Sequence, residues 1–433
     1  MDRVRIPESV SVDRPSDFPR DGMFRDPRTR PFRDERGVYH VFSHADVMRV
    51  LLNVDRQFSM DITRLLPDDH HMRRDFMWYT EPFAPDGGPG RHDILRGVVE
   101  PWFRTRAVRT MEPVIRDLAR GLIDEIIEQG TGEFNLASEL AYRLSLRVIC
   151  RLLGIGLERE EWLRQKEGEY LQAASFSDSP RQWDLEAYYW SLVAKRLAHP
   201  QDELLDVLVA AWKEGTLSDR ELLGFASGFV TAGTDTTGTS IVNGFALLAE
   251  FGYLDEVRDS LDDPDVMRRV VDEILRFGTA FPALPVVVID DAAFDGLTIP
   301  AGSVLRAWLA AANRDEAVNG GDVQKPPSVF DPFRWPNRHL ALGHGRHYCL
   351  GAELARLEMR IALEETLRRL PKLQMDDTKP FKRFAGIIDG VSEAHFRFDD
   401  SAARRFINAD AGAGRWVRQG SAEAASATDG PDH

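Results

Sequence analysis

The 433-residue chain has little cysteine and no excess of positive charge. Its two cysteines, Cys150 and Cys349, exclude a disulfide-stabilised scaffold and fit a reducing compartment. Asp and Glu outnumber Lys and Arg by 70 to 55, which gives a formal net charge of −15. This balance argues against nucleic acid or an anionic membrane as the main partner, because both are polyanions.

The chain also lacks long hydrophobic runs. No window approaches ~18 uninterrupted apolar residues, so no bilayer span is expected. Residues 1–7 are charged and have no apolar stretch of the kind found in a signal peptide. We therefore expect a cytoplasmic protein that works without a membrane.

Helical periodicity dominates what is present. Hydrophobic residues, 43% of the chain, can fill a large core. The pattern predicts a single, mainly α domain with a small β part over residues 38–400, between an irregular segment at 1–37 and a flexible Ala-Gly-Ser-Asp-rich tail at 401–433. The predicted helices are 108–129, 134–154, 201–213, 218–250, 264–278 and 352–370, and the predicted strands lie in 38–42, 284–289 and 297–309, the last divided by a turn at 300–302.

The most informative stretch is 339–358, where glycines form a tight loop and a helix begins at Ala352. Cys349 thus precedes a helix N-terminus, where free N–H groups stabilise a thiolate. Three interpretations compete: a small core cysteine, an axial thiolate for haem iron, or a zinc site. The zinc site would combine the cysteine with His339, His344 and His347, although this spacing matches no standard zinc finger.

The predicted helix 218–250 contains a segment whose composition disfavours a helix. It opens with a capping box from Ser218 and Glu221, but its middle, residues 232–239, is rich in Gly and Thr, which are poor helix formers. A Thr hydroxyl that bonds back to a helix carbonyl opens a notch for dioxygen and water, and Asp235 supplies a carboxyl beside it. The simpler alternative is two shorter helices joined by a Gly-Thr turn.

Two charged pairs follow helical spacing. Glu273 and Arg276 lie three apart in a helix that begins at Asp263-Pro264, and His92 and Arg96 lie four apart. Each pair alone is typical of an ordinary solvated helix face. Paired cations such as His92 and Arg96 are also suitable anchors for the propionates of a haem.

Together these motifs resemble the cytochrome P450 family, and in particular its soluble bacterial members. The resemblance rests on Gly345-x-x-x-Cys349-x-Gly351, preceded by His339-Leu340-Ala341 and followed by Leu354-Ala355-Arg356, and it spans roughly residues 10–400 with the motifs in the family's order. One departure is Leu342, at a position where the family usually has Phe.

The resemblance implies a role for each motif. Cys349 would be the axial ligand of haem b in a loop shaped by Gly345 and Gly351. Asp235 would relay protons and Thr236 would assist O–O cleavage. The family's propionate ligands correspond to His92, Arg96 and His347, and its structural Glu-x-x-Arg network to Glu273, Arg276 and Arg334.

The implied activity is that of a monooxygenase that uses O2 and electrons from a ferredoxin and a ferredoxin reductase, because the chain has no room for a reductase. We expect a monomer. Four arginines around the ligand loop predict a locally basic face that would steer an acidic iron–sulfur partner: Arg338, Arg346, Arg356 and Arg360.

A second departure concerns the haem propionates. The family's further propionate-binding Arg falls at Val286, and this chain has no Arg, Lys or His between Arg276 and Arg306. The stretch 282–288 is apolar instead, which predicts a hydrophobic wall beside the substrate. The predicted substrate contacts are Phe76, Trp78, Tyr79 and Phe83 in a lid, together with Ala232, Leu284, Val286 and Val287.

The substrate class follows only coarsely from these residues. They suggest a mid-sized, apolar or partly aromatic natural-product precursor, which would be hydroxylated or closed by an oxidative C–N or C–C bond. Two alternatives stay open. One is a haem-thiolate protein with non-oxygenating or peroxide-driven chemistry, and the other is a zinc-dependent or structural helical protein.

Overall fold

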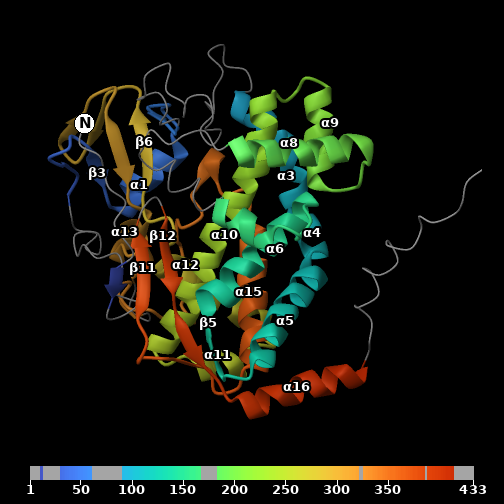
Figure 1. The fold of residues 1–433 in the computed structure, drawn as a ribbon. Coiled ribbons are helices and arrows are strands. Elements are labelled where there is room, and N and C mark those ends of the chain that lie inside the picture. Colours follow the sequence, from blue (N-terminus) through green and yellow to red (C-terminus); the bar gives the residue numbers. More distant parts are fainter. Residues whose placement is uncertain are drawn as a thin grey trace, which may run out of the picture.

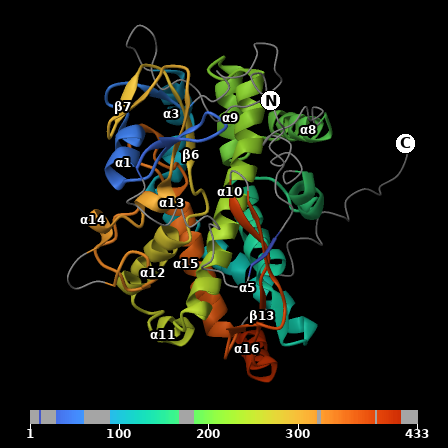
Figure 2. The ribbon, with the colours of Figure 1, turned by 90° about the vertical axis from the view of Figure 1, so that its left-hand side faces the viewer.

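The computed structural model describes residues 10–12, 30–60, 90–166, 183–320, 325–385 and 388–413. A long helix, α10 (Asp219–Glu250), runs through the middle of the molecule, with other helices packed around it and sheets gathered on one side (Figures 1 and 2). The mainly helical fold with a small β part, expected from the sequence, is confirmed. The other helices are α1 (His44–Leu52), α3 (Arg91–Phe103), α4 (Thr105–Thr110), α5 (Glu112–Gln129), α6 (Tyr142–Leu153), α8 (Trp183–Ala198), α9 (Leu204–Lys213), α11 (Leu254–Asp259), α12 (Pro264–Phe277), α13 (Leu309–Ala312), α14 (Glu316–Asn319), α15 (Ala352–Arg369) and α16 (Asp400–Ala413).

The strands form four small sheets. The five-stranded sheet has the order β2-β3-β9-β6-β4, and the others are β1-β11-β12, β10-β13-β5 and the pair β7-β8. The strands are β1 (Val10–Val12), β2 (Phe32–Arg33), β3 (Tyr39–Val41), β4 (Phe58–Ser59), β5 (Glu133–Asn135), β6 (Leu284–Val288), β7 (Ala292–Phe294), β8 (Leu297–Ile299), β9 (Val304–Ala307), β10 (Gln374–Met375), β11 (Phe381–Ala385), β12 (Asp389–Glu393) and β13 (His395–Arg397).

Helix α10 is continuous over 32 residues. The Ser218 hydroxyl caps it by accepting from the Glu221 N–H, and the Glu221 carboxylate accepts from the Ser218 N–H, as the capping box predicts. The alternative of two shorter helices joined by a Gly-Thr turn is therefore wrong. Packing overrides the poor local propensity: the segment from Thr237 to Leu248 is buried throughout.

Several sequence-based boundaries need correction. The segment predicted as one helix over 134–154 starts with β5 and a short stretch of π-helix (Leu136–Ala141) before α6, because Asn135 caps the backbone at Ala137. The predicted helix 108–129 is interrupted at Met111, between α4 and α5. In 297–309 the turn lies where expected, but the last residue already belongs to α13.

Helix α16 occupies the start of the segment that the composition assigned to a flexible tail. Asp399 accepts a hydrogen bond from the Ala402 N–H at 3.1 Å, and the alanines that follow are the best helix formers. Compositional bias alone did not separate an Ala-rich helix from an Ala-rich coil. At the other end, β1 and β2 lie inside the segment expected to be irregular.

The main hydrophobic core surrounds α10 and is built from α5, α6, α12 and α15. A second cluster joins the five-stranded sheet to α1. Where the structure describes the chain, no helix is both long and apolar enough to cross a membrane.

Candidate active site

A cavity of about 500 Å³ lies between α3, α6, α10, α15 and the loop before α15. It brings together eight residues singled out from the sequence: Cys349, His347, Gly351, His92, Arg96, Thr236, Ala232 and Leu284. Sequence reasoning missed much of the rest of its wall, including Phe103, Ser145, Phe225, Phe229, Glu358 and Ile388. The four-residue spacing of Phe225 and Phe229, just before the Gly-Thr segment, is the one signal that could have revealed part of this wall.

The Cys349 side chain is exposed to this cavity while protein surrounds it on its other sides. Its N–H donates to the Leu342 carbonyl at 2.9 Å, which closes the loop just before α15. Burial raises the pKa of the Cys349 thiol, whereas the Gly351 N–H and the charges of Arg356 and Arg96 oppose that rise. A cation bound at the sulfur would shift the balance to the thiolate.

Gly345 and Gly351 have different roles in the cysteine loop. Gly345 has a φ of +70°, and a Cβ there would lie 2.9 Å from the Leu51 carbonyl oxygen, so this position must be Gly for the loop to pack against α1. Gly345 does not line the cavity, unlike Gly351. Gly345, which the resemblance grouped with the haem-binding loop, therefore shapes that loop by packing against α1, and of these two glycines Gly351 is the one that reaches the cavity.

His92 and His347 meet at one end of the cavity, with ring centroids 4.4 Å apart, and Arg96 lies one helical turn from His92. Burial and the nearby charges of Arg96 and Arg346 lower the pKa of His92 to about 4. Burial and the neighbouring His92 lower the pKa of His347 to about 4. The His347 Nε2 is buried without a hydrogen-bond partner among the described residues.

These residues fit an anionic group. An unsatisfied buried nitrogen costs about 1–3 kcal/mol, and a carboxylate beside His347, His92 and Arg96 would remove that cost. With the thiol of Cys349 facing the same cavity, the donor set suits a haem held by its iron and by at least one propionate. The ordinary solvated helix face considered for His92 and Arg96 does not describe them.

On α10, Thr236 lines the cavity and its Oγ1 donates to the Ala232 carbonyl at 2.6 Å. The back-bond expected from the sequence is confirmed, and it forms without breaking the helix. Asp235 does not line the cavity and acts electrostatically on Tyr142 of α6. Burial raises the pKa of Asp235 to about 7, with a small opposing effect from Arg164.

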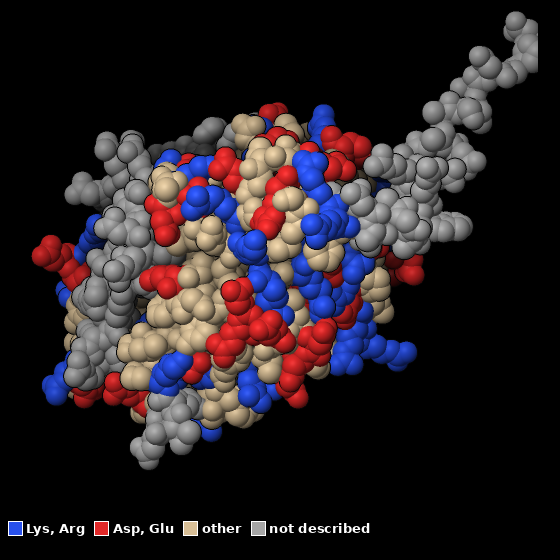
Figure 3. All heavy atoms as spheres, turned by 90° about the horizontal axis from the view of Figure 1, so that it is seen from below, with Lys and Arg blue, Asp and Glu red and all other residues tan. Residues whose placement is uncertain are grey.

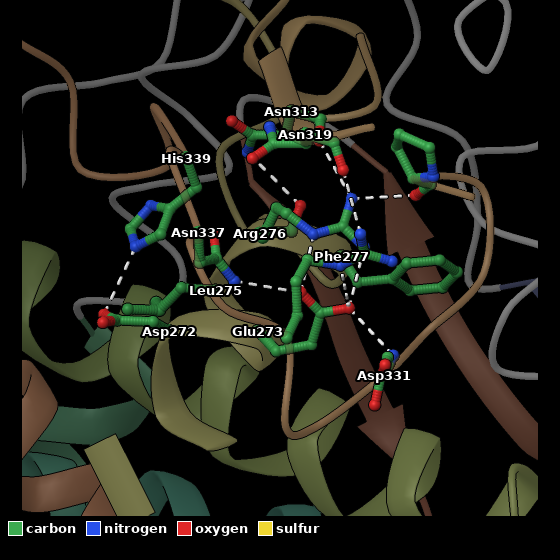
Figure 4. Close-up of polar contacts among 12 residues, drawn as sticks. Asp272, Glu273, Leu275, Arg276, Phe277, Asn313, Asn319, Asp331, Asn337 and His339 are labelled. Atoms are coloured by element: carbon green, nitrogen blue, oxygen red, sulfur yellow. Dashed lines mark hydrogen bonds and ion pairs between the residues drawn. The ribbon is translucent and has the colours of Figure 1, made fainter. Parts of the chain in front are cut away.

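Glu273 and Arg276 form a fully buried ion pair, with both exposed fractions at 0% (Figure 4). The guanidinium donates to the two carboxylate oxygens at 2.6 and 2.8 Å, and Arg334, also fully buried, donates to Glu273 at 3.3 Å. The structure thus joins the three residues that the sequence grouped, and the alternative of a surface pair is wrong. Asn313 extends the network by accepting from the Leu340 N–H at 2.6 Å, just before the cysteine loop.

Two predicted substrate contacts lie elsewhere. Val286 and Val287 are 2% and 5% exposed and belong to the core of the five-stranded sheet, where Val286 lies opposite Leu305. Of that strand, Leu284 alone reaches the cavity. The apolar run therefore reflects sheet burial. The lid residues Phe76, Trp78, Tyr79 and Phe83 lie outside the described residues.

The structure gives no support to a zinc site. His339 points to Asp272, with 3.4 Å between Nε2 and Oδ1 (Figure 4). No group of three or more His, Cys, Asp or Glu side chains in the described ranges is placed to hold a metal ion.

Comparison with known proteins agrees with this geometry. The model of the family "Cytochrome P450" matches residues 258–388. The chain is 35% identical over 334 residues to the mycinamicin IV hydroxylase/epoxidase of Micromonospora griseorubida, covering 73% of this chain and 81% of that protein. The chain belongs to the cytochrome P450 family. It is also similar to the erythromycin C-12 hydroxylase of Saccharopolyspora erythraea, at 32% identity over 382 residues, 83% of this chain and 89% of that protein.

The fold comparison extends the likeness to most of the chain. The structure of a post-tailoring hydroxylase involved in himastatin biosynthesis superposes with a TM-score of 0.74 at 27% identity, covering 88% of this chain and 97% of that one. This protein is thus a cytochrome P450 monooxygenase, and its family carries a haem-thiolate cofactor.

The predicted basic face of this cytochrome P450 is largely neutralised by pairing. Arg346 pairs with Asp93, Arg356 with Asp272, and Arg360 with Glu112 and Glu364, the last pair at 2.9 Å. On the face seen from below in Figure 3, basic and acidic side chains are interspersed in the same way. Three of the four arginines grouped from the sequence therefore carry their own counter-charges.

Proposed function

We propose that this cytochrome P450 hydroxylates a neutral, largely apolar natural-product intermediate, using O2 and electrons from a ferredoxin and its reductase. The observation that carries the proposal is the composition of the cavity wall outside the cysteine loop. Most of it is apolar, with Phe103, Phe225, Phe229, Leu284 and Ile388 among its members, and the charged or titratable side chains among the lining residues are His92, Arg96, His347, Tyr348, Cys349 and Glu358. The names of the relatives, hydroxylases acting in macrolide and himastatin pathways, support the same class of substrate.

The cofactor we propose is haem b. Cys349 would hold the iron, and His92, Arg96 and His347 would hold propionate. When bound, the haem supplies the oxidising chemistry that activates dioxygen. No Arg occupies the Val286 position, so we assign propionate binding to the cluster of His92, Arg96 and His347.

The residues of α10 would deliver protons to the site. Thr236 faces the cavity and, with its hydroxyl held by the Ala232 carbonyl, offers a fixed oxygen for water or a reacting group. Asp235 has a pKa of about 7, near the pH at which an acid both holds and releases a proton readily. Its position behind the cavity wall suits a group that exchanges protons between the protein interior and the site.

The experiment that tests the substrate class is a spin-state titration of the haem-loaded protein. Macrolide aglycones and cyclic peptides would be compared with fatty acids and other charged ligands of similar size. The proposal predicts spectral shifts for neutral guests and none for charged ones. Preference for carboxylates would contradict it. Product analysis under ¹⁸O₂ would then place one labelled oxygen in the hydroxylated product.

The electron supply and the oligomeric state are tested separately. Turnover should need both a ferredoxin and its reductase, and peroxide alone should not replace them. Light scattering on the holoenzyme should give the mass of one 49.0 kDa chain.

A further inference from the structure

A tyrosine directly before the cysteine joins the cysteine loop to two arginines. Tyr348 is partly buried and lines the same cavity as Cys349. Its backbone carbonyl accepts a hydrogen bond from Arg96 of α3 at 2.9 Å, and its phenol oxygen accepts one from Arg356 of α15 at 3.0 Å. Helices α3 and α15 therefore hold the residue next to the cysteine by its backbone and by its side chain.

Arg356 is itself held from a second side. Its Nε donates to the Asp272 Oδ1 of α12 at 3.0 Å, and its NH1 lies 3.7 Å from the Glu353 carboxylate. The His339 Nε2 lies 3.4 Å from the same Asp272 oxygen (Figure 4). A planar guanidinium that donates from two nitrogens to two different elements has little freedom to rotate. We call the set of Tyr348, Arg356 and Asp272 the arginine clamp.

The arginine clamp places a positive charge near the sulfur. The charges that act on the pKa of Cys349 are those of Arg356 and Arg96, and both lower it against the effect of burial. No carboxylate among the described residues contributes to that pKa. Burial would lower the pKa of Arg356, but its contacts with Tyr348 and Asp272 outweigh burial and raise it, so the guanidinium stays charged.

A positive charge near a thiolate ligand changes how readily a bound haem takes up an electron. Reduction adds one negative charge to the haem-thiolate unit, so a nearby cation stabilises the reduced form more than the oxidised form. Hydrogen bonds and charges around a ligand sulfur tune the potential of such centres. The propionate that Arg96 would hold neutralises Arg96, whereas Arg356 does not line the cavity and keeps its charge when haem is bound.

We propose that Tyr348 and Asp272 are positioning residues that fix the charge of Arg356 beside the cysteine loop, and that this charge raises the reduction potential of the bound haem. One electron from the ferredoxin converts iron(III) to iron(II), with no proton transferred and no bond broken, and the raised potential makes this transfer more favourable. The inference rests on the haem-thiolate site of the proposed function. It gives the phenol oxygen of Tyr348 a role that a Phe ring cannot fill.

The test is the reduction potential of haem-loaded variants, measured by spectroelectrochemical titration without substrate. At a fixed applied potential, Arg356→Gln should lower the ratio of reduced to oxidised protein about tenfold, which is a shift of about −59 mV for a one-electron couple. Tyr348→Phe should shift the potential in the same direction by a smaller amount, because the cation stays but is no longer held by the phenol. Arg356→Lys keeps the charge and should recover part of the loss.

Two matched variants serve as controls. Arg360→Gln removes a guanidinium one turn further along α15, which pairs with its own carboxylates and does not contribute to the pKa of Cys349. Tyr253→Phe removes another phenol that accepts a hydrogen bond from a cation, here Lys325, away from the cavity. Both controls should keep the wild-type reduction potential.

The carbon monoxide complex of the reduced protein separates the possible failures. A wild-type protein without the band of a thiolate-ligated haem would overturn the proposed function, on which the inference rests. With that band present, equal potentials for Arg356→Gln and Arg360→Gln would overturn the inference and leave the proposed function standing. If Arg356→Gln does not retain haem, Tyr348→Phe decides, and a potential equal to that of Tyr253→Phe would overturn the inference.

Salt dependence distinguishes a fixed charge from a freely moving surface charge. Exposed charges are screened within ~3 Å at about 1 M salt, whereas partly buried charges are screened much less. The Arg356 side chain is 25% exposed, so the shift in Arg356→Gln should persist at this salt concentration. Loss of the shift would show that the clamp does not fix the charge, and it would overturn the inference.

Discussion

Replacing Glu273 by Gln isolates the charge of the buried network on α12. The side chain keeps its size, but two guanidiniums, Arg276 and Arg334, then lie fully buried without a counter-charge. The substitution turns one carboxylate oxygen into an NH2 group, which donates hydrogen bonds and does not accept them. This group then faces another donor, either the Arg276 guanidinium or the Asn337 Nδ2, which donates to Glu273 at 3.0 Å. Removing one partner of a buried ion pair costs about 3–5 kcal/mol.

The expected shift in melting temperature follows from the size of the chain. Unfolding entropy of ~2.1 cal/mol/K per residue gives about 0.9 kcal/mol/K for 433 residues. The cost of about 3–5 kcal/mol therefore lowers Tm by about 3–6 °C, measured by circular dichroism on haem-loaded protein.

An exposed pair provides the control. Glu161 is 79% exposed and pairs with Arg164 three residues away, so Glu161→Gln should cost at most about 1 kcal/mol and shift Tm by about 1 °C or less. Because the network reaches the segment before the cysteine loop, Glu273→Gln should also release haem faster. Equal melting temperatures for Glu273→Gln and Glu161→Gln would refute the assignment of this network as the support of the cysteine loop.

Three further predictions concern the cavity. Thr236→Ala should divert electrons from product to peroxide, which is measured as peroxide released per NADPH consumed; unchanged coupling would mean that its hydroxyl is not used. His347→Ala should weaken haem retention about tenfold in transfer to apomyoglobin, because a charge-assisted hydrogen bond is worth about 1.5–3 kcal/mol; equal transfer rates would remove its propionate role. For Asp235, burial raises the pKa from 3.8 to about 7, so the folded protein keeps a proton that the unfolded chain releases, and stability is lost as pH rises through that window. The Tm of Asp235→Asn should therefore rise relative to that of the wild type as the pH rises from about 4 to 7. A Tm difference that does not change with pH would contradict the raised pKa of Asp235.

The sequence predicted secondary structure correctly where the local pattern was strongest. Helix α10 was expected at 218–250 and spans Asp219–Glu250, because its start carries a capping box and its length leaves many periodic positions. Motif residues on α3, on α10 and in the cysteine loop line one cavity, and the motif on α12 forms a buried network that reaches the segment before that loop. Each of these motifs combines a fixed spacing with a specific chemistry.

What the sequence did not reveal depends on packing between distant segments. Val286 and Val287 carry the same apolar signal whether they face a substrate or a sheet core, and the pairing of β6 with β9 decides the matter. In the sequence, Glu358 follows an ordinary helical pattern. Its position in the cavity wall depends on packing against Ser145, which lies 213 residues away in the sequence. Gly345 stood out as a cofactor-loop glycine, but the nearby Leu51 carbonyl explains the requirement.

The most direct test of the central claim is the absorption spectrum of the dithionite-reduced, haem-loaded protein with and without carbon monoxide. If Cys349 is the haem ligand, the reduced carbon monoxide complex shows the strongly red-shifted Soret band of a thiolate-ligated haem, and Cys349→Ala lacks it. A reduced complex that binds haem but shows no such band, or a Cys349→Ala variant that keeps it, would contradict the claim.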